Sequence, residues 1–297
     1  MQLKELTTER RNRATENLDL MTSLELVTAM NREDAVVPRA IKRVLPEIAR
    51  AVDIIARCLS KGGRLIYVGT GTSGRIGALD ASECPPTFGT KPEMVQFLIA
   101  GGESALVRAT ESSEDSAELG RADMAARRPG KRDVVVGIAA SGRTPFTIAA
   151  LKYASGKGAE TIAVACNRGS ALGKAAKLRI EVEVGPEVLA GSSRLKGGTA
   201  QKLICNMLTT GAMAKLGYVY SNLMVNLHLK NEKLLERGIW ILESLAEVER
   251  ETAVRALEKA EMSVPVALVM LKADVSRTEA ARRLRKTSGN VRKAIEG

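Results

Sequence analysis

The pattern of hydrophobic positions changes about two thirds of the way along the chain. Up to residue 218, short and nearly continuous apolar runs alternate with segments of helical periodicity. The apolar runs have the length of strands and cover residues 64–68, 94–100, 133–140, 161–166 and 178–184. Strands that are apolar over most of their length are typically buried on both faces. The pattern therefore predicts a doubly wound α/β domain over residues 55–218, with a mainly parallel five-stranded sheet and helices on both faces.

The residues before this domain are predicted to be helical. Thr22 or Ser23 is suited to cap a short helix over residues 22–32. Apolar residues then recur at three- and four-residue steps from 38 to 59, which predicts one longer helix with a kink at Pro46. We expect residues 1–54 to form N-terminal helices that pack on the core.

The residues after the domain also show helical periodicity, without any strand. Near the end of the chain, Ser276 and Glu279 have the spacing of a capping box, and TSGN at 287–290 separates two short helices. We therefore expect residues 219–297 to form a helical C-terminal region that includes a small three-helix module.

Composition narrows the class of partner. The formal net charge is +11, which is compatible with nucleic acid, anionic lipid or phosphorylated metabolites. Only 3% of residues are aromatic, which disfavours a surface that stacks bases. No apolar run approaches the roughly 18 residues of a membrane span, and the charged N-terminus lacks the apolar region of a signal peptide. We expect a cytoplasmic protein that binds neither membrane nor nucleic acid.

Cysteine and histidine offer little material for a metal site. Cys58, Cys84, Cys166 and Cys205 are widely separated and are expected to be buried free thiols. His228 is the only histidine and lies between apolar residues, so we expect it to pack in a helix. The sequence predicts no metal and no cofactor, and acid–base chemistry is left to carboxylates, Lys, Tyr or Cys.

Three loops combine glycine with serine or threonine. They read GTGTSGR at 69–75, ASGRTP at 140–145 and GSSRLKGGT at 191–199, and the first two follow strands and precede helices. Backbone N–H groups, hydroxyl groups and the positive end of a helix dipole together suit a phosphate dianion. The three loops therefore predict a phosphate site at the carboxyl ends of the strands.

The first loop also has the G-x-G-x-x-G spacing of a dinucleotide site, but its surroundings differ. A dinucleotide site needs an acidic residue at the end of the second strand, where only the later Glu103 is available. A triphosphate P-loop needs G-K-[ST], whereas this loop ends in SGR. Both alternatives are weaker than a monophosphate site.

Seven motifs follow one another along nearly the whole chain. They are GTGTSGRIG, DASECPPTFG, IAGGESA, ESSEDS, GIAASGRTP, GSSRLKGGTAQK and NLMVNLHLKNEKL. In this order and at compatible separations, they resemble the N-acetylmuramic acid 6-phosphate etherases, which carry a sugar isomerase domain.

The resemblance implies an enzyme, a carbon–oxygen lyase of the hydro-lyase type. Such an enzyme cleaves the D-lactyl ether at C3 of N-acetylmuramic acid 6-phosphate and gives N-acetylglucosamine 6-phosphate and D-lactate during peptidoglycan recycling. The partner is then a phosphorylated amino sugar, and a homodimer with its active site near the interface is expected.

The resemblance also implies roles for individual residues. Glu83 is expected to protonate the departing lactate, and Glu114 is the second catalytic carboxylate, suited to act as the base at C2. We place Glu83 in a stiff segment that ends the helix begun at the phosphate loop, where a nearby phosphate and partial burial would raise its pKa. The substrate-binding residues implied are Thr72, Ser73, Gly74, Ser141, Gly142, Arg143, Thr144, Ser192, Ser193, Arg194 and Lys196.

The residues taken alone are also compatible with two other functions. Seven Lys or Arg residues lie between 277 and 293 against one Glu, which is compatible with a DNA-binding regulator that responds to a sugar phosphate. A basic solvated face on a helical bundle is the simpler interpretation. An aldose–ketose phosphosugar isomerase is the second alternative, because that reaction also moves a proton at C2.

Overall fold

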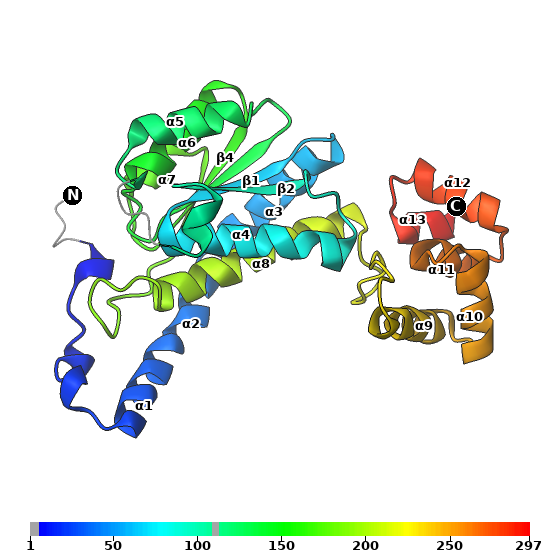
Figure 1. Ribbon diagram of the computed structural model, residues 1–297, viewed down its shortest axis with the longest axis horizontal. Coiled ribbons are helices and arrows are strands. Elements are labelled where there is room, and N and C mark those ends of the chain that lie inside the picture. The colour runs from blue at the N-terminus through cyan, green and yellow to red at the C-terminus, as the bar shows by residue number, and fades with distance from the viewer. Residues whose placement is uncertain (1–5, 109–112) are drawn as a thin grey trace. The chain divides into compact units, whose positions relative to one another are not determined.

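The computed structural model describes residues 6–108 and 113–297, which form two compact units (Figure 1). The first unit contains Met1–Ser82 and Pro92–Thr209, and the second contains Glu83–Lys91 and Thr210–Gly297. Two of the boundaries fall inside the continuous helices α4 (Gly71–Phe88) and α8 (Lys196–Leu216).

The first unit is built on a parallel sheet of five strands. The strands are β1 (Leu65–Gly69), β2 (Val95–Ile99), β3 (Val134–Ile138), β4 (Glu160–Ala165) and β5 (Leu178–Glu181). Their order is β2-β1-β3-β4-β5, and every neighbouring pair is parallel. All five apolar runs are confirmed as strands, and β1 and β3 are buried along their whole length.

Helices cover both faces of the sheet, as predicted. Figure 1 shows α5 (Ala117–Ala126) and α6 (Pro145–Gly156) on one face and α3 (Leu45–Ser60), α4 and α8 on the other. The short helices α7 (Ala171–Ala175) and η5 (Glu103–Leu106) lie in the connections.

On the second face, Tyr67 of β1 donates a hydrogen bond to Asp80 of α4 (2.8 Å), and Thr209 of α8 donates to the same carboxylate (3.2 Å). This buried contact fixes α4 and α8 to the sheet, although burial raises the pKa of Asp80.

The N-terminal residues form short 3-10 turns and a sequence of helices. The turns are η2 (Thr7–Glu9), η3 (Arg13–Thr15) and η4 (Leu18–Leu20), and α1 (Ser23–Asp34) follows. Thr22 caps α1 in a reciprocal capping box with Glu25, so the predicted cap is confirmed.

The single kinked helix predicted over 38–59 is wrong, because two helices occupy this range. They are α2 (Val36–Lys42) and α3, separated at residues 43 and 44. Pro46 has no N–H to continue the ladder and disfavours helical geometry in the residue before it. The chain therefore closes α2 with tight hydrogen bonds from Arg43 and Val44 and begins a new helix with Pro46 in its first turn.

The prediction that α4 ends at Glu83 is also wrong, since this helix continues to Phe88. Pro85 and Pro86 lie in its last turn, where their fixed φ is compatible with a helix and only two N–H donors are lost. The ladder resumes when Gly89 donates to the carbonyl of Pro85 (2.9 Å). Glu83 is therefore an interior helical residue.

The second unit is helical from α9 onward. Its helices are α9 (Glu232–Ala246), α10 (Arg250–Lys259), α11 (Val264–Ala273), α12 (Arg277–Lys286) and α13 (Val291–Glu296). They bury a core of their own, formed by residues such as Leu242, Leu257 and Leu268. The predicted boundary between the last two helices at TSGN is confirmed.

Four of the basic residues in these last helices form ion pairs or a cation–π contact within the second unit. Ser276 caps α12, but the carboxylate of Glu279 pairs with Arg282 and Arg283 rather than with the cap, so only half of the predicted capping box forms. These two arginines hold the pKa of Glu279 at about 2. In the same unit, Arg277 pairs with Glu261 (2.5 Å), and Arg292 lies over the ring of Tyr220 (4.6 Å). These contacts favour a solvated basic face over a nucleic-acid surface.

The expectations for cysteine are confirmed, and the one for histidine is not. All four cysteines are free and buried. His228 is exposed and lies outside any helix, because the segment that precedes α9 is irregular. Over residues 6–108 and 113–297, no helix is long and apolar enough to cross a membrane.

Candidate active site

The loops after β1 and β3 diverge at one point of the sheet. The chain moves from β1 outward to β2, then returns past β1 to β3, so the strand order reverses between β1 and β3. The carboxyl ends of two such strands leave a crevice, because their loops lead to opposite sides. Loop 1 (70–75) and loop 2 (140–144) lie at this crevice.

Two glycines allow the backbone of these loops to pack closely. Gly142 has φ +67°, and a Cβ there would lie 2.4 Å from Cβ of Ser170. At Gly74, in the first turn of α4, a Cβ would lie 2.6 Å from the side chain of Ile99. A side chain at either position would displace its neighbours, so glycine is required for the shape of the crevice.

Loop 3 (191–199) reaches the same crevice through the start of α8. Gly198 lies beside Thr72, whose methyl group would be 3.5 Å from a Cβ at that glycine. Gly197 lies beside Ala140 of loop 2 at the same kind of distance, 3.5 Å. Asn167, just after β4, donates to the carbonyls of Ala140 (3.2 Å) and Ser141 (3.4 Å). The structure thus brings together the three loops that the sequence singled out, which we call the cradle.

The cradle contains a buried polar atom without a partner. Ser73 donates a hydrogen bond to Oε1 of Gln201 on α8 (3.0 Å), and both side chains are buried. Among the described residues, no acceptor lies within hydrogen-bond distance of the Nε2 of Gln201. Because an unsatisfied buried donor costs about 1–3 kcal/mol, such a group is expected where a ligand supplies the acceptor. The sequence reasoning missed Gln201, although it stands in the quoted GTAQK motif.

A carboxylate lies at the edge of the cradle. The hydroxyl of Thr144 in loop 2 donates to Glu114 (3.3 Å), and the N–H of Phe146 donates to the Glu114 carbonyl (3.2 Å). Glu114 is half-buried. Loop 2 therefore holds Glu114 in place; in its ESSEDS motif, Glu111 and Ser112 lie outside the described residues.

Lys196 lies beneath loop 3 rather than in the open crevice. Its side chain is 2% exposed, and its ammonium group pairs with Glu33 of α1. Glu187 accepts hydrogen bonds from the N–H groups of Lys196 (3.0 Å) and Gly197 (2.9 Å), at the start of α8. Burial raises the pKa of Glu187 despite these two donors. Lys196 and Glu187 thus hold loop 3, in which Ser192 and Ser193 are half-buried.

The three arginines of the loops differ in their contacts. Arg75 donates to the carbonyls of Leu106 (3.0 Å) and Arg108 (3.1 Å), so it fixes the segment after η5. Arg143 and Arg194 are exposed.

Glu83 lies on α4, ten residues beyond Ser73, and it is exposed. The partial burial expected for its carboxylate is therefore absent in the single chain. Glu114, by contrast, is held against loop 2 by the hydroxyl of Thr144.

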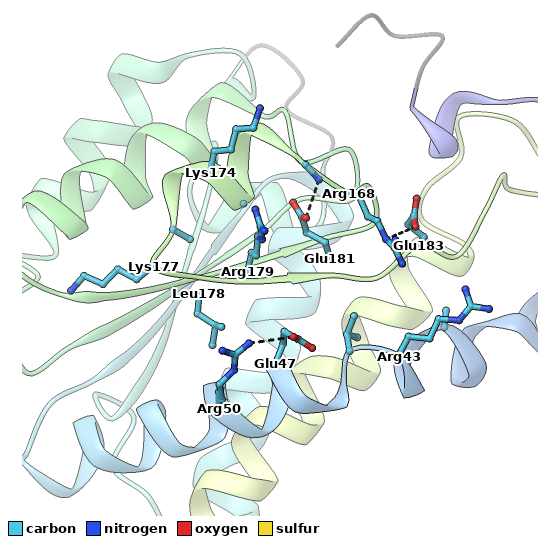
Figure 2. A pocket seen from close by; sticks show the side chains of 15 residues that line it. Arg43, Glu47, Arg50, Arg168, Lys174, Lys177, Leu178, Arg179, Glu181 and Glu183 are labelled. Atoms are coloured by element: carbon cyan, nitrogen blue, oxygen red, sulfur yellow. Dashed lines mark hydrogen bonds and ion pairs between the residues drawn. The ribbon is translucent and has the colours of Figure 1, made fainter.

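A wide pocket lies away from the cradle, beside the edge strand β5 (Figure 2). Its volume is about 790 Å³, and we call it the β5 groove. Three of its cations are paired: Arg50 with Glu47 (3.2 Å), Arg168 with Glu183 (2.7 Å) and Lys177 with Glu160 (3.6 Å). The charged residues that line it are Arg43, Glu47, Arg50, Arg168, Lys174, Lys177, Arg179, Glu181 and Glu183. None of the residues implied by the sequence lies in this groove.

No group of three or more His, Cys, Asp or Glu side chains that could hold a metal ion occurs in residues 6–108 and 113–297. The donors of the cradle are hydroxyl, amide and backbone N–H groups, which suit an anion rather than a cation.

Known protein families and individual relatives are similar to this chain. Residues 118–211 match the SIS domain family, and residues 47–155 match the N-terminal SIS domain of glucokinase regulatory protein. Proteins named N-acetylmuramic acid 6-phosphate etherase are similar over almost the whole chain. The protein from Halalkalibacterium halodurans is 52% identical over 99% of this chain and 98% of its own length. The one from Clostridium beijerinckii is 49% identical over 100% and 97%.

Solved structures of lower identity share the fold. A phosphoheptose isomerase from Francisella tularensis is 19% identical and superposes with a TM-score of 0.50, covering 64% of this chain and all of that protein. A Bacteroides fragilis protein assigned to the phosphosugar isomerases is 18% identical with a TM-score of 0.53, covering 70% and 98%.

Proposed function

This chain belongs to the N-acetylmuramic acid 6-phosphate etherase family, and we propose that the cradle, Glu114 and Glu83 together carry out the reaction of that family. The enzyme is a carbon–oxygen lyase. It cleaves the D-lactyl ether of N-acetylmuramic acid 6-phosphate and gives N-acetylglucosamine 6-phosphate and D-lactate.

The reaction needs proton transfers at two neighbouring positions of the sugar, C2 and the oxygen on C3. In the open-chain sugar, a base takes the C2 proton, which is acidified by the C1 aldehyde. The C3–O bond then breaks, and its electron pair leaves with the lactate oxygen, which an acid protonates. Water adds to C3 of the unsaturated aldehyde and a proton returns to C2. Each positioned acid or base typically contributes about 10²–10⁴-fold to the rate.

The cradle is the proposed anchor for the phosphate group. The N–H groups of Thr72 and Ser73 and the hydroxyl of Thr72 would face the phosphate at the N-terminus of α4, where the helix dipole favours a dianion. Gly74 is proposed to allow the close approach of the phosphate, since its own N–H donates to the carbonyl of Thr70 (3.1 Å). The free Nε2 donor of Gln201 supports this assignment, since a phosphate oxygen would satisfy it. Ser141, Gly142, Arg143 and Thr144 are proposed to complete the anchor.

The third loop is proposed to close the sugar site. Ser192, Ser193 and Arg194 would contact the sugar, whereas the buried ion pair of Lys196 gives that residue a structural contribution to the loop. An anchored phosphate restricts the flexible open chain and so places C2 and C3 at a defined distance from the anchor.

The two carboxylates are proposed to divide the proton transfers, with Glu114 as the base at C2 and Glu83 as the acid for the lactate oxygen. The contact between Thr144 and Glu114 is the observation that carries the first assignment, because it joins a loop of the phosphate anchor directly to a carboxylate. A base held in this way needs no movement before it takes the proton.

We also propose the domain boundaries, the cellular location and the oligomeric state of the enzyme. The matched SIS regions together span residues 47–211, which supports a sugar isomerase domain over about 55–218, preceded by N-terminal helices (1–54) and followed by the helical region 219–297. We further propose a cytoplasmic homodimer, in keeping with a phosphorylated intermediate of metabolism.

Isotopic labelling tests this function directly. The purified protein is incubated with N-acetylmuramic acid 6-phosphate in D₂O and H₂¹⁸O, and D-lactate is assayed. We expect D-lactate, together with deuterium at C2 and ¹⁸O at C3 of the product. Label at C2 without lactate would instead support an aldose–ketose isomerase, and absence of both would contradict the proposal.

A further inference from the structure

A buried asparagine lies directly behind loop 2 of the cradle. Asn167 follows β4, the strand that pairs with β3, and it is 1% exposed. A buried amide is costly unless its oxygen and its nitrogen both find hydrogen-bond partners. The partners of Asn167 therefore show which parts of the chain this side chain holds together.

The amide oxygen accepts two hydrogen bonds from the N-terminal segment. The N–H and the hydroxyl of Thr7 each lie 2.8 Å from Oδ1 of Asn167. A backbone N–H can only donate, so this contact fixes which end of the amide is the oxygen. The amide nitrogen consequently faces loop 2.

The amide nitrogen donates to loop 2 and to the N-terminal segment. Its acceptors are the carbonyl of Ala140 (3.2 Å), the carbonyl of Ser141 (3.4 Å) and the hydroxyl of Thr8 (3.2 Å). Two hydrogens serve these three acceptors, so at least one hydrogen is shared. Every hydrogen-bond partner of the amide in the described part of the chain is electrically neutral.

The carbonyl of Ala140 determines the direction of a donor in loop 2. It accepts from the N–H of Cys166 (2.9 Å) as well as from Asn167, so it points toward β4. The N–H of Ser141 belongs to the same trans peptide and points the opposite way. Because β1 lies on the other side of β3, this N–H is directed toward loop 1 and the crevice. Within the described residues, it has no acceptor.

The N-terminal segment that meets the amide is fixed at its other end as well. We call residues 7–15 the strap. The hydroxyl of Thr15, at its end, donates to the carbonyl of Val188 (2.8 Å), just before loop 3. Asn12, near its middle, donates to the carbonyl of Pro186 (3.4 Å). The strap thus joins the segments behind loops 2 and 3 and can hold the amide in one orientation.

From these contacts we infer that Asn167 is a positioning residue of the phosphate anchor. Its amide holds the peptide between Ala140 and Ser141 so that the N–H of Ser141 faces the phosphate, and the strap holds the amide. The inference rests on the proposed function and adds the group that orients loop 2. A donor oriented in advance needs no rearrangement when the dianion binds, whereas a loop that must first be ordered binds it more weakly.

Asn167→Asp tests the inference with almost no change of shape. The carboxylate keeps an acceptor for Thr7 but places a second oxygen against the two carbonyls of loop 2, which it repels. At about pH 8 we expect the KM for N-acetylmuramic acid 6-phosphate and the Kd of inorganic phosphate each to rise about tenfold, with a smaller change in kcat. Steady-state D-lactate assays and titration calorimetry measure these constants.

Lowering the pH gives a result that a purely structural contribution would not produce. Burial and the facing carbonyl oxygens would raise the pKa of the introduced carboxyl group, and its protonated form can donate as the amide does. The phosphate Kd of the variant divided by that of the wild type should therefore fall toward one between about pH 8 and about pH 5.5. This ratio removes the titration of phosphate itself. A raised ratio that stays constant over this range would overturn the inference.

Thr161→Val is the matched control. Thr161 is also 1% exposed and also lies on β4, but at the end remote from the cradle, where its hydroxyl accepts from the N–H of Lys177 (3.1 Å). We expect this substitution to lower the unfolding midpoint and to leave KM and the phosphate Kd unchanged. If Asn167→Asp is folded by circular dichroism and shows the same pattern as Thr161→Val, the inference is overturned.

Two further measurements separate the inference from the function and from misfolding. If the wild type releases no D-lactate, the proposed function fails, and the phosphate Kd still decides whether Asn167 positions the anchor. If Asn167→Asp does not fold, Thr7→Val decides, because Thr7 is half-buried and supplies one of the two donors to the amide oxygen. Thr7→Val should raise the phosphate Kd about twofold, and an unchanged value would overturn the inference.

Discussion

Two regions of the sheet domain offer cationic or donor groups to an anion, and they are built in opposite ways. The β5 groove is wide and lined by long charged side chains, several of which already pair with carboxylates (Figure 2). The cradle has few charges and consists of hydroxyls, a buried amide and backbone N–H groups held by tightly packed glycines.

The difference shows why charge is a poor guide to the site. Exposed cations are screened by water and lose side-chain entropy when they bind, so each contributes little. Fixed donors in a partly buried crevice need no rearrangement and act in a lower dielectric. The β5 groove is better explained as protection of an edge strand, since charged residues along an exposed edge oppose pairing with other chains.

The largest difference between the two regions should appear in turnover. Glu114→Gln is expected to lower kcat about 10²–10⁴-fold because the base at C2 is lost. Arg179→Gln in the β5 groove should leave kcat within about twofold, since surface substitutions away from a site rarely exceed about 0.5 kcal/mol. Steady-state D-lactate assays compare the two. A loss of kcat at Arg179 that matches the loss at Glu114 would contradict the assignment of the cradle as the reacting site.

The next effect concerns backbone packing. Gly74→Ala places a Cβ 2.6 Å from Ile99 and 2.9 Å from the carbonyl of Gly69, so it should destabilise the protein by about 1–3 kcal/mol through overpacking. Denaturant unfolding measures the change. In the groove wall, no Cβ would meet an atom within 4 Å at Gly169, although its φ of +64° still strains an alanine. An unchanged midpoint for Gly74→Ala would show that the cradle is not tightly packed.

A smaller effect is expected at the amide beneath the cradle. Gln201→Leu should raise KM about tenfold with little change in kcat, because one donor to the phosphate is lost, about 1.4 kcal/mol. The free enzyme should also lose about 1–3 kcal/mol of stability, because the buried hydroxyl of Ser73 loses its acceptor, the Oε1 of Gln201. Arg43→Gln in the β5 groove is the control and should leave KM unchanged. A normal KM for Gln201→Leu would remove this residue from the anchor.

The buried carboxylate at the start of α8 predicts a dependence of stability on pH. Burial raises the pKa of Glu187 above its ordinary value of about 4.5. A carboxyl group with a raised folded pKa contributes stability that is full below the unfolded pKa and is lost as pH rises through the folded pKa. The free energy of unfolding of the wild type relative to Glu187→Gln should therefore fall as the pH rises above the ordinary pKa of a glutamate and through the raised pKa of the folded state. Unfolding titrations that show this difference rising with pH would contradict the prediction.

The smallest effect is expected at a glycine where the cradle has room. A Cβ at Gly197 would meet its nearest atom, an oxygen of Glu187, at 3.4 Å, which is ordinary contact. Gly197→Ala lies in the first turn of α8 and should be neutral or stabilise the protein by up to about 1 kcal/mol. Thermal unfolding compares it with Gly74→Ala. Equal destabilisation by both substitutions would show that the glycines of the cradle do not differ in packing.

Much of the fold follows from local pattern. The runs that became β1 and β3 were predictable because both strands are buried along their whole length and contain no charged residue. The edge strand β5 is only partly buried and contains Arg179 and Glu181. Both incorrect helix predictions involve proline, whose effect depends on its position within the helix. Pro46 separated two helices, whereas Pro85 and Pro86 were accommodated in the last turn of α4.

The candidate site was only partly predictable. The loops 69–75, 140–145 and 191–199 were recognisable from their glycine and hydroxyl residues, and Glu83 and Glu114 from a family resemblance. Gln201 was missed because a glutamine in a helix has no pattern of its own until a neighbour such as Ser73 defines it. Lys196 was expected at the substrate, but its charge is satisfied by Glu33, a residue 163 positions away.

The sequence by itself determined the elements, the class of sheet and the types of chemical group available, since these depend on the periodicity and composition of neighbouring residues. The tertiary structure decided which groups meet. It placed Thr144 against Glu114 and the amide of Gln201 against Ser73, and it left Glu83 exposed along α4. Contacts between residues far apart in the chain depend on strand order and on packing between helices, and neither is written in the pattern of any single segment.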